Sequence, residues 1–143
     1  MNVATLLKAK GRAVATSPST ASLHEVSVAL AEKRIGAMVI VDARNSVIGI
    51  VSERDIVRAI ASNGPEVLLR QVSEIMTRDV TICGLDRTIE ELMGMMTKGR
   101  FRHLPVVEDG NLVGIISIGD VVKHHIAEVQ MEVSAMREYL ATG

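Results

Sequence analysis

Two segments of the chain carry a serine and an aspartate three residues apart at the start of a predicted helix. They read GIVSERD and GIISIGD, so that Ser52 and Asp55 recur as Ser117 and Asp120, 65 positions later. A serine hydroxyl beside the free N–H groups of a helix N-terminus can bind phosphate or hydroxyl oxygens. The aspartate, one turn on, can accept hydrogen bonds from the two neighbouring hydroxyls of a ribose. The pair also makes an ordinary helix N-cap, and both roles can hold at once because the cap builds the edge of such a pocket.

A run of basic residues, Lys98-Gly-Arg-Phe-Arg-His103, could bind the phosphate of the same ligand. If the run is extended, Arg100 and Arg102 share one face and Phe101 turns inward. Guanidinium groups bind phosphate oxygens with two parallel hydrogen bonds, and the imidazole of His103 adds a further donor. The alternative is a solvated loop whose charges are incidental.

The first copy of the pattern differs in charge at this position. It has Arg34-Ile-Gly-Ala37 where the second copy has the basic run, so the cationic run is not duplicated. We therefore predict two related sites that differ in phosphate binding. Arg54, next to Ser52, is a further candidate phosphate contact.

Neither a catalytic centre nor a metal site is predicted. Cys83 has no His/Asp context that would make it a nucleophile, and there is no glycine-rich phosphate loop. His124 and His125 are adjacent on a predicted helix and so point about 100° apart, whereas a metal pair on a helix needs spacing of three or four residues. We expect a protein that is not an enzyme and binds no metal.

The elements that position these residues also occur twice. Upstream of each serine, Val14, Ser22, Glu25 and Val41 recur 66 positions later as Val80, Thr88, Glu91 and Val107. A period of this size indicates two copies of one supersecondary unit. Each copy predicts strand, helix, strand, strand, helix. The first strands are predicted at 14–16 and 80–82. The helices that follow start with the capping boxes at 22–25 and 88–91 and stop near Gly36 and Gly99. The hairpins pair 37–41 with 47–51 and 104–107 with 112–116.

These patterns divide the chain into five parts. They are a short helix over 1–12, a first repeat over 13–63, a connecting segment over 64–78, a second repeat over 79–128 and a helix extension over 129–143. Each repeat alone is small and would bury little surface. We therefore expect one body with a shared core, and the apolar residues of the connecting segment should pack on it.

The final helix has an apolar seam. Val122, Ile126, Val129, Val133, Met136 and Leu140 are spaced alternately by four and three residues, as at the a and d positions of a coiled coil. Two interpretations stay open: the helix lies on its own chain, or it contacts a second subunit.

Composition excludes several classes of protein. The net charge of −1 and the near absence of aromatic residues, 1%, give no reason to expect nucleic-acid binding. A single cysteine excludes an intrachain disulfide, and no stretch approaches the roughly 20 apolar residues of a membrane span. No signal peptide is evident, so we expect a cytoplasmic protein.

The combined motifs IGAMVIVD, GIVSERDIV, RHLPVVEDG and GIISIGDVV resemble a tandem pair of CBS (cystathionine β-synthase) domains, a stand-alone Bateman module. The resemblance covers nearly the whole chain. It implies an α+β fold of two β-α-β-β-α repeats packed with pseudo-two-fold symmetry, ligand clefts between the repeats and a homodimer.

Such modules typically bind adenosine nucleotides, AMP, ADP or ATP, and some bind NAD(H) or S-adenosylmethionine. By this resemblance Asp55 and Asp120 contact ribose hydroxyls, and Ser52 and Ser117 contact phosphate or ribose.

The resemblance also assigns roles outside the doubled motif. Backbone near Thr16 and Ile82 holds the adenine edge, and Arg102 and His103 meet phosphates. Gly36-Ala37 takes the place of that basic pair in repeat one, so Ala37 is a ligand-contacting position without charge.

Three functions compete. The leading hypothesis is a sensor of adenosine nucleotides that signals to a separate effector protein. The alternatives are an S-adenosylmethionine sensor, and a dimeric interaction or scaffold protein whose clefts are vestigial.

Overall fold

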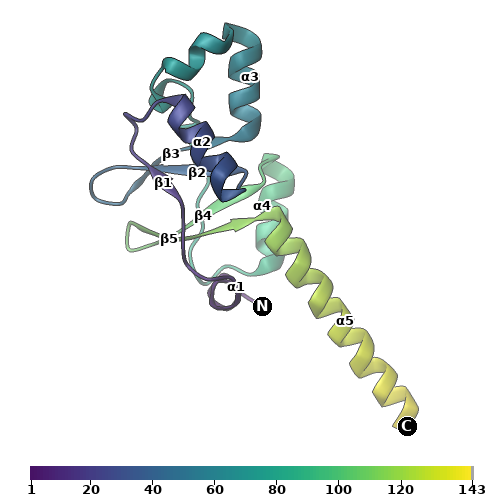
Figure 1. Cartoon of the computed structure of the whole chain (residues 1–143). Helices are drawn as coiled ribbons and strands as arrows, with labels where there is room; N and C mark the ends of the chain where they lie inside the picture. Colours follow the sequence, from purple (N-terminus) through teal and green to yellow (C-terminus); the bar gives the residue numbers. More distant parts are fainter. Residues whose placement is uncertain (143) are drawn as a thin grey trace.

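The computed structural model describes residues 1–142 and confirms two β-α-β-β-α repeats (Figure 1). Repeat one consists of β1 (Thr16–Ser17), α2 (Leu23–Lys33), β2 (Ala37–Val41), β3 (Val47–Ser52) and α3 (Glu53–Asn63). Repeat two has an isolated bridge at Cys83 in place of the first strand, followed by α4 (Ile89–Gly99), β4 (His103–Glu108), β5 (Asn111–Ser117) and α5 (Ile118–Thr142). Helix α1 (Val3–Lys10) precedes the repeats, and the short 3₁₀ helices η1 (Pro65–Leu69) and η2 (Val72–Glu74) connect them.

Side-chain caps start the first helix of each repeat, but the predicted capping box is complete only at 88–91, since the Glu25 carboxylate does not return the bond to the Ser22 N–H. The Ser22 hydroxyl accepts a hydrogen bond from the Glu25 backbone N–H at 3.0 Å. The Thr88 hydroxyl does the same for Glu91 at 3.1 Å, and the Glu91 carboxylate accepts in return from the Thr88 N–H at 3.3 Å. These bonds satisfy N–H groups that a helix start leaves without partners.

These helices end near the predicted glycines, α2 at Lys33 and α4 at Gly99, but other residues make the terminating turn. Arg34 and Arg100, with φ of 54° and 55°, adopt the left-handed conformation that ends α2 and α4, and the predicted stops Gly36 and Gly99 do not. Because Arg100 turns the chain in this way and β4 begins only at His103, the predicted extended run over 100–103 is also wrong.

The two hairpins form as predicted, and the first strands are shorter and later than expected. Strands β2 and β3 pair antiparallel, as do β4 and β5, and positive φ at Asp109 and Gly110 closes the second hairpin. Strand β1 adds to β2 in parallel through Thr16 and Ser17. Its counterpart in repeat two is a single parallel bridge from Cys83 to Val106.

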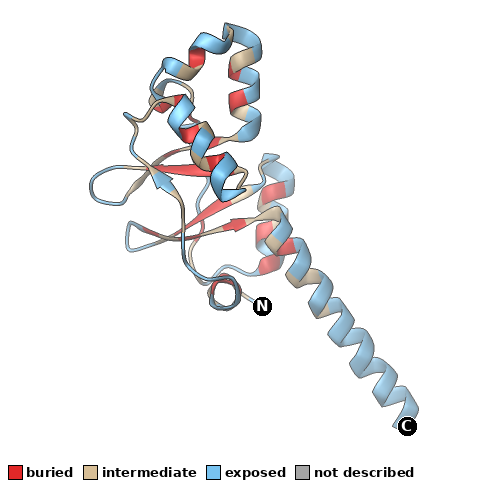
Figure 2. Cartoon of the chain, in the orientation of Figure 1, coloured by how far each residue is buried: buried red, intermediate tan, exposed pale blue. Residues whose placement is uncertain are grey.

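The expected shared core is wrong, because each repeat has its own buried apolar cluster (Figure 2). The repeat-one cluster contains Leu23, Val26, Leu30, Met38, Ile40, Val51, Ile56, Ala59, Val67, Val72 and Met76. The last three come from the connecting segment, which packs on the body as predicted. The repeat-two cluster contains Val3, Leu6, Leu7, Cys83, Ile89, Leu92, Met96, Leu104, Val106, Ile116 and Val121.

Helix α1 precedes repeat one in the chain yet packs in the core of repeat two. Its Val3, Leu6 and Leu7 are fully buried there. Backbone hydrogen bonds fix the attachment, for example from Val3 N–H to the Arg87 carbonyl at 2.8 Å. The chain must then cross from repeat two to repeat one over residues 11–15, which ties the two cores together.

The connecting segment does for repeat one what the N-terminus does for repeat two. The Val72 N–H donates to the Ala21 carbonyl at 2.8 Å, matching the bond made by Val3. Met76 packs against Gly49, and Leu7 packs against Gly114, where a Cβ would overlap either side chain. The glycine of the doubled motif therefore makes room for an apolar side chain that arrives from outside the repeat.

Helix α5 leaves the body and extends away from it (Figure 1). Val121 is its only buried residue, and every residue of the described helix after Glu128 is exposed. The interpretation that the final helix lies on its own chain is therefore wrong beyond its first turns.

We predict that Leu7→Ala lowers the free energy of unfolding by about 2–5 kcal/mol, because it empties a fully buried site in the core of repeat two. Urea unfolding followed by circular dichroism measures the loss. Leu69→Ala is the matched control, since Leu69 is 83% exposed and its truncation should change stability by no more than about 0.5 kcal/mol. Equal effects of the two substitutions would contradict the packing of α1 described above.

Candidate ligand-binding clefts

The two Ser/Asp motifs have the same local geometry. In each, the serine hydroxyl accepts from the aspartate N–H at 3.2 Å, and the aspartate carboxylate accepts from the serine N–H at 2.9 Å. Each motif stands where a strand ends and a helix begins, β3 to α3 and β5 to α5. Both aspartates are partly buried, so one carboxylate oxygen serves the cap while the group stays accessible.

A cavity of ≈ 500 Å³ adjoins the motif of repeat two. This volume lies within the roughly 300–1,000 Å³ usual for small-molecule sites. Its walls come from the crossing segment, from the end of α2 with the start of β2, and from repeat two. The lining residues are Lys10, Ala13, Val14, Ala15, Lys33, Arg34, Ile35, Gly36, Ala37, His103, Ile115 and Ser117.

The cavity is therefore a cleft between the repeats. The crossing segment over 11–15 forms one wall because α1 is anchored on repeat two while β1 belongs to repeat one. His103 of repeat two closely approaches Gly36 of repeat one, where a Cβ would lie 3.3 Å from the imidazole. A ligand in this cleft would touch both repeats at once.

Asp120 is held by a lysine that sequence reasoning did not select. The ammonium of Lys10 lies 2.6 Å from the Asp120 carboxylate and donates a second hydrogen bond, at 2.7 Å, to the Ile115 carbonyl. Burial opposes ionisation of Asp120, but the hydrogen bonds from Lys10 and Ser117 outweigh it and hold the pKa of the carboxyl below its usual value. The carboxylate is thus charged at neutral pH and already engaged by a cation.

Several charged groups near the cleft act on the pKa of His103. Burial is the main reason that the pKa of its imidazole is lowered, and the positive charge of Lys10 acts in the same direction. Asp120 and Glu53 oppose the shift. The imidazole is therefore neutral at pH 7 and can both donate and accept a hydrogen bond.

The other predicted positions are dispersed. Ala37 lines the cleft, but Thr16 lines a separate hollow of ≈ 290 Å³ beside α2. Arg54 and Ile82 are exposed, and neither lines one of the two cavities. Three motif residues, Ser52, Asp55 and Asp120, also line neither cavity, so that Ser117 is the motif residue in the lining.

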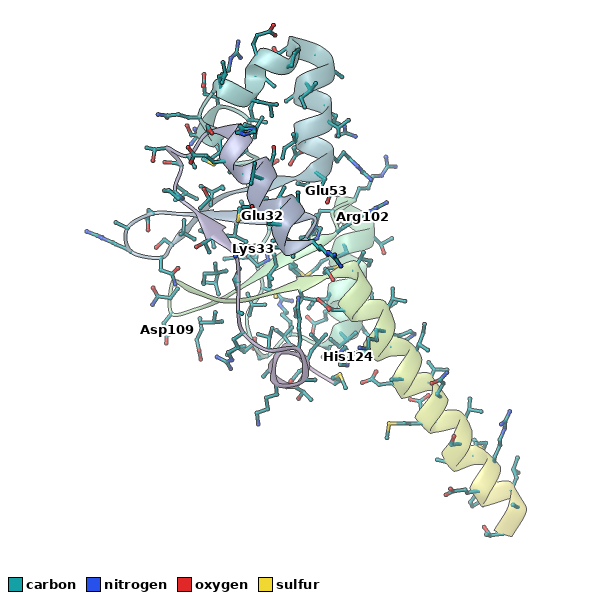
Figure 3. The ribbon with its side chains drawn as sticks, in the orientation of Figure 1. Glu32, Lys33, Glu53, Arg102, Asp109 and His124 are labelled. Atoms are coloured by element: carbon teal, nitrogen blue, oxygen red, sulfur yellow. The ribbon has the colours of Figure 1, made fainter. Side chains whose placement is uncertain are left out.

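Of the predicted basic run, only His103 reaches the cavity. Arg100 and Arg102 are exposed, and Phe101 turns inward against the repeat-two cluster as expected. Figure 3 shows Arg102 in the same region as Lys33, at the end of α2, and Glu53, at the start of α3.

Three cationic residues of the cleft were missed, Lys10, Lys33 and Arg34. Arg34 occupies in repeat one the left-handed position that Arg100 occupies in repeat two, so the basic feature is in part duplicated after all. The segment that contains Lys10 has a counterpart 69 positions later, since Val3 and Leu7 correspond to Val72 and Met76. This second, weaker repeat in the sequence could have drawn attention to Lys10. At that offset Lys10 corresponds to Asp79.

Three further observations concern Cys83, metal ligands and helix length. Burial raises the pKa of the Cys83 thiol to about 11, so the thiol is protonated at neutral pH and is a poor nucleophile. Among residues 1–142, no three His, Cys, Asp or Glu side chains are grouped closely enough to hold a metal ion. No helix over the same residues has the length and apolar character needed to cross a membrane.

Known proteins resemble the chain in both sequence and structure. A family model described as the CBS domain matches residues 11–62 and 72–126. A CBS-domain containing protein of Agrobacterium tumefaciens is 47% identical, with a TM-score of 0.85, and the match covers 87% of this chain and 99% of that one. A mitochondrial CBS domain-containing protein of Arabidopsis thaliana is 27% identical over 99% of this chain and 72% of its own length, but this chain spans only 21% of another Arabidopsis relative.

Two similar structures contain adenosine compounds. A CBS domain protein of Pyrobaculum aerophilum in complex with AMP is 30% identical, with a TM-score of 0.74 over 84% of this chain and 89% of that one. The CBS domain pair of protein MJ0100, in complex with 5′-methylthioadenosine and S-adenosyl-L-methionine, is 27% identical, with a TM-score of 0.80 over 90% of this chain and 98% of that one.

We predict that the protein loses stability as the pH falls below about 6.5, the ordinary pKa of histidine, because the unfolded chain then binds a proton that folded His103 resists. Thermal unfolding between pH 7.5 and 5.5, in steps, measures the slope. His103→Gln should flatten it, whereas His24→Gln, at an exposed position, should leave it unchanged. An identical slope in the His103 variant would show that this imidazole is not the group responsible.

Proposed function

The chain belongs to the CBS domain family, and we propose that it is a regulatory module that binds an adenosine nucleotide between its two repeats. The observation that carries the proposal is the cavity of ≈ 500 Å³ that is lined by Ser117 and by several cations. The charged Asp120 lies next to this lining, bonded to Lys10 and to Ser117. In this proposal Asp120 receives the ribose hydroxyls. Ser117 and the backbone N–H groups at the start of α5 face the phosphate or the ribose, and the crossing segment holds the adenine edge.

The charge of the cleft favours a ligand that carries phosphate. Lys33 and Arg34 line it, and Lys10 neutralises Asp120, so the cavity has an excess of positive charge. AMP, ADP, ATP and NAD(H) bring negative phosphates that such a site attracts. S-adenosylmethionine brings a sulfonium cation, which the same groups repel, although a similar CBS pair is known in complex with it. We therefore place the S-adenosylmethionine sensor second.

Binding in this cleft would couple the repeats. The walls of the cleft come from both repeats. One wall is the crossing segment, which leads directly from α1 in the core of repeat two. A ligand that prefers one arrangement of these walls shifts the population toward it, by no more than its difference in affinity for the two arrangements. We propose that a separate effector protein reads this shift and that the module itself catalyses no reaction.

The second motif would bind more weakly. Ser52 and Asp55 keep the same capping geometry, but no ion pair to Asp55 forms within residues 1–142. At the sequence position that corresponds to Lys10 stands Asp79, whose negative charge disfavours phosphate. We therefore expect the Ser52/Asp55 motif to bind a phosphate-bearing ligand more weakly than the Ser117/Asp120 motif.

We predict that AMP, ADP, ATP or NADH raises the melting temperature of protein shown to be free of nucleotide, and does so more than adenosine or S-adenosylmethionine. A ligand at ~100 times its Kd adds about 2.7 kcal/mol of stability. Differential scanning fluorimetry measures the shift, and titration calorimetry gives the affinity. The absence of a shift with every adenosine compound would rule out the proposed function.

Asp120→Asn tests the assignment of the ribose site, because the amide oxygen can still cap α5 while the charge is lost. Affinity should fall by about tenfold or more, the usual loss for hydrogen bonds to a charged group. Asp55→Asn makes the same change in the other motif, which lines neither cavity, and should cost less. Asp109→Asn, in the exposed hairpin turn, is the neutral control.

Lys10→Met should lower the ratio of AMP affinity to adenosine affinity. Removing the ammonium frees Asp120 for ribose hydroxyls, which benefits both ligands equally, but it removes an attraction that only the phosphate experiences. The ratio cancels the shared gain and isolates the phosphate contribution. Lys8→Met, an exposed position on the same helix, should leave the ratio unchanged. If Lys10→Met leaves the ratio unchanged, Lys10 stabilises the ligand-free protein and does not contribute to phosphate binding.

A further inference from the structure

The apolar seam of α5 faces solvent. Its six residues are between 43% exposed, at Val129, and 70% exposed, at Leu140. An apolar stripe of this length on one helix is unusual for a surface that faces only water. The helix also stands clear of the body, so a partner could reach the seam along its length (Figure 2).

The spacing of the seam is that of a two-stranded coiled coil. Ile126, Val133 and Leu140 take the a positions, and Val122, Val129 and Met136 take the d positions. β-Branched residues occupy both a and d positions, so the apolar residues alone do not select two strands, and the flanking charges carry that choice. The seam is short for an isolated coiled coil, but α5 is already held by its first turns against the body, so the cost of starting the helix does not fall on the association.

The charges that flank the seam select both the partner and its direction. Glu132 lies at a g position and Arg137 at the following e position. In a parallel pair each g residue faces the e residue of the next heptad on the other helix, so Glu132 would meet Arg137 of a second copy twice by symmetry. The seam is thus complementary to itself.

The opposite direction lacks this complementarity. In an antiparallel pair e positions face e positions, and these hold Lys123, Gln130 and Arg137. Every register therefore brings like charges, or a charge and an amide, together across the seam.

We infer that α5 associates with α5 of a second copy of this chain as a parallel coiled coil, which sets the two CBS bodies side by side at the same end. The inference does not depend on the proposed ligand, because no residue of the seam lines the cleft. It supplies a direction and an interface for a dimer that the family resemblance leaves unspecified.

The test measures association of the full chain by sedimentation equilibrium over a concentration series. We expect a dimer whose Kd rises about tenfold in Glu132→Arg, because two attractive pairs become two repulsive ones. The double variant Glu132→Arg with Arg137→Glu restores the pairs with their signs exchanged and should restore the Kd. Val133→Asp, which places a charge in the seam, should give a monomer with unchanged circular dichroism.

Direction is tested separately by cross-linking. Leu140→Cys in a Cys83→Ser background should form an intermolecular disulfide on mild oxidation, since equivalent a positions meet in a parallel pair. Lys123→Cys in the same background, in an e position away from the axis, is the control and should cross-link poorly. A monomeric chain, a dimer that Val133→Asp leaves intact, or a seam-dependent dimer that Leu140→Cys does not cross-link would each overturn the inference.

Discussion

The attachment of α1 to the second repeat is the constraint on which the rest of the structure depends. Burying Val3, Leu6 and Leu7 removes three large apolar side chains from water, and each contributes roughly 1.5–3 kcal/mol. A helix that precedes one repeat is thereby fixed on the other, and the chain must cross between them. The connecting segment makes the reciprocal attachment through Val72 and Met76. Two small cores, each marginal alone, are therefore completed by segments that lie outside their own repeats.

The cleft follows directly from this crossing. Residues 11–15 run from α1 to β1 and become a wall, and the end of α1 brings Lys10 to Asp120. The two reciprocal backbone-to-side-chain bonds of the cap recur in both motifs, so the doubled motif builds the same frame twice. The Ser117 hydroxyl also donates to Asp120. The chemical difference between the two frames comes from residues that enter from elsewhere. Lys10 is one such residue, and its counterpart at the same place in the sequence is Asp79.

Local signals in the sequence predicted the repeated fold well because capping boxes, a hairpin turn and apolar periodicity act over a few residues. The separate cores could not be predicted in this way, because they depend on contacts between segments far apart in the sequence. Helix α1 packs on repeat two, and the connecting segment packs on repeat one. The charge of the cleft was only partly predicted for the same reason. His103 was selected because it lies in a visible basic run, whereas Lys33 and Arg34 reach the cleft through the left-handed turn that ends α2. Arg100 and Arg102 were grouped on the assumption that residues 100–103 are extended. Arg100 instead adopts the left-handed conformation that ends α4, so the two side chains do not share a strand face.

The Lys10–Asp120 contact both attaches α1 to repeat two and occupies the carboxylate that a ligand would use. The Lys10 ammonium links α1 to the start of α5 through Asp120 and the Ile115 carbonyl. Any ligand that takes over the Asp120 carboxylate must compete with this link, so part of its binding free energy is spent in releasing the end of α1. By linkage, whatever loosens α1 from repeat two must strengthen such a ligand to the same degree. This ion pair between α1 and repeat two is therefore also the contact through which binding at Asp120 would affect the N-terminal helix.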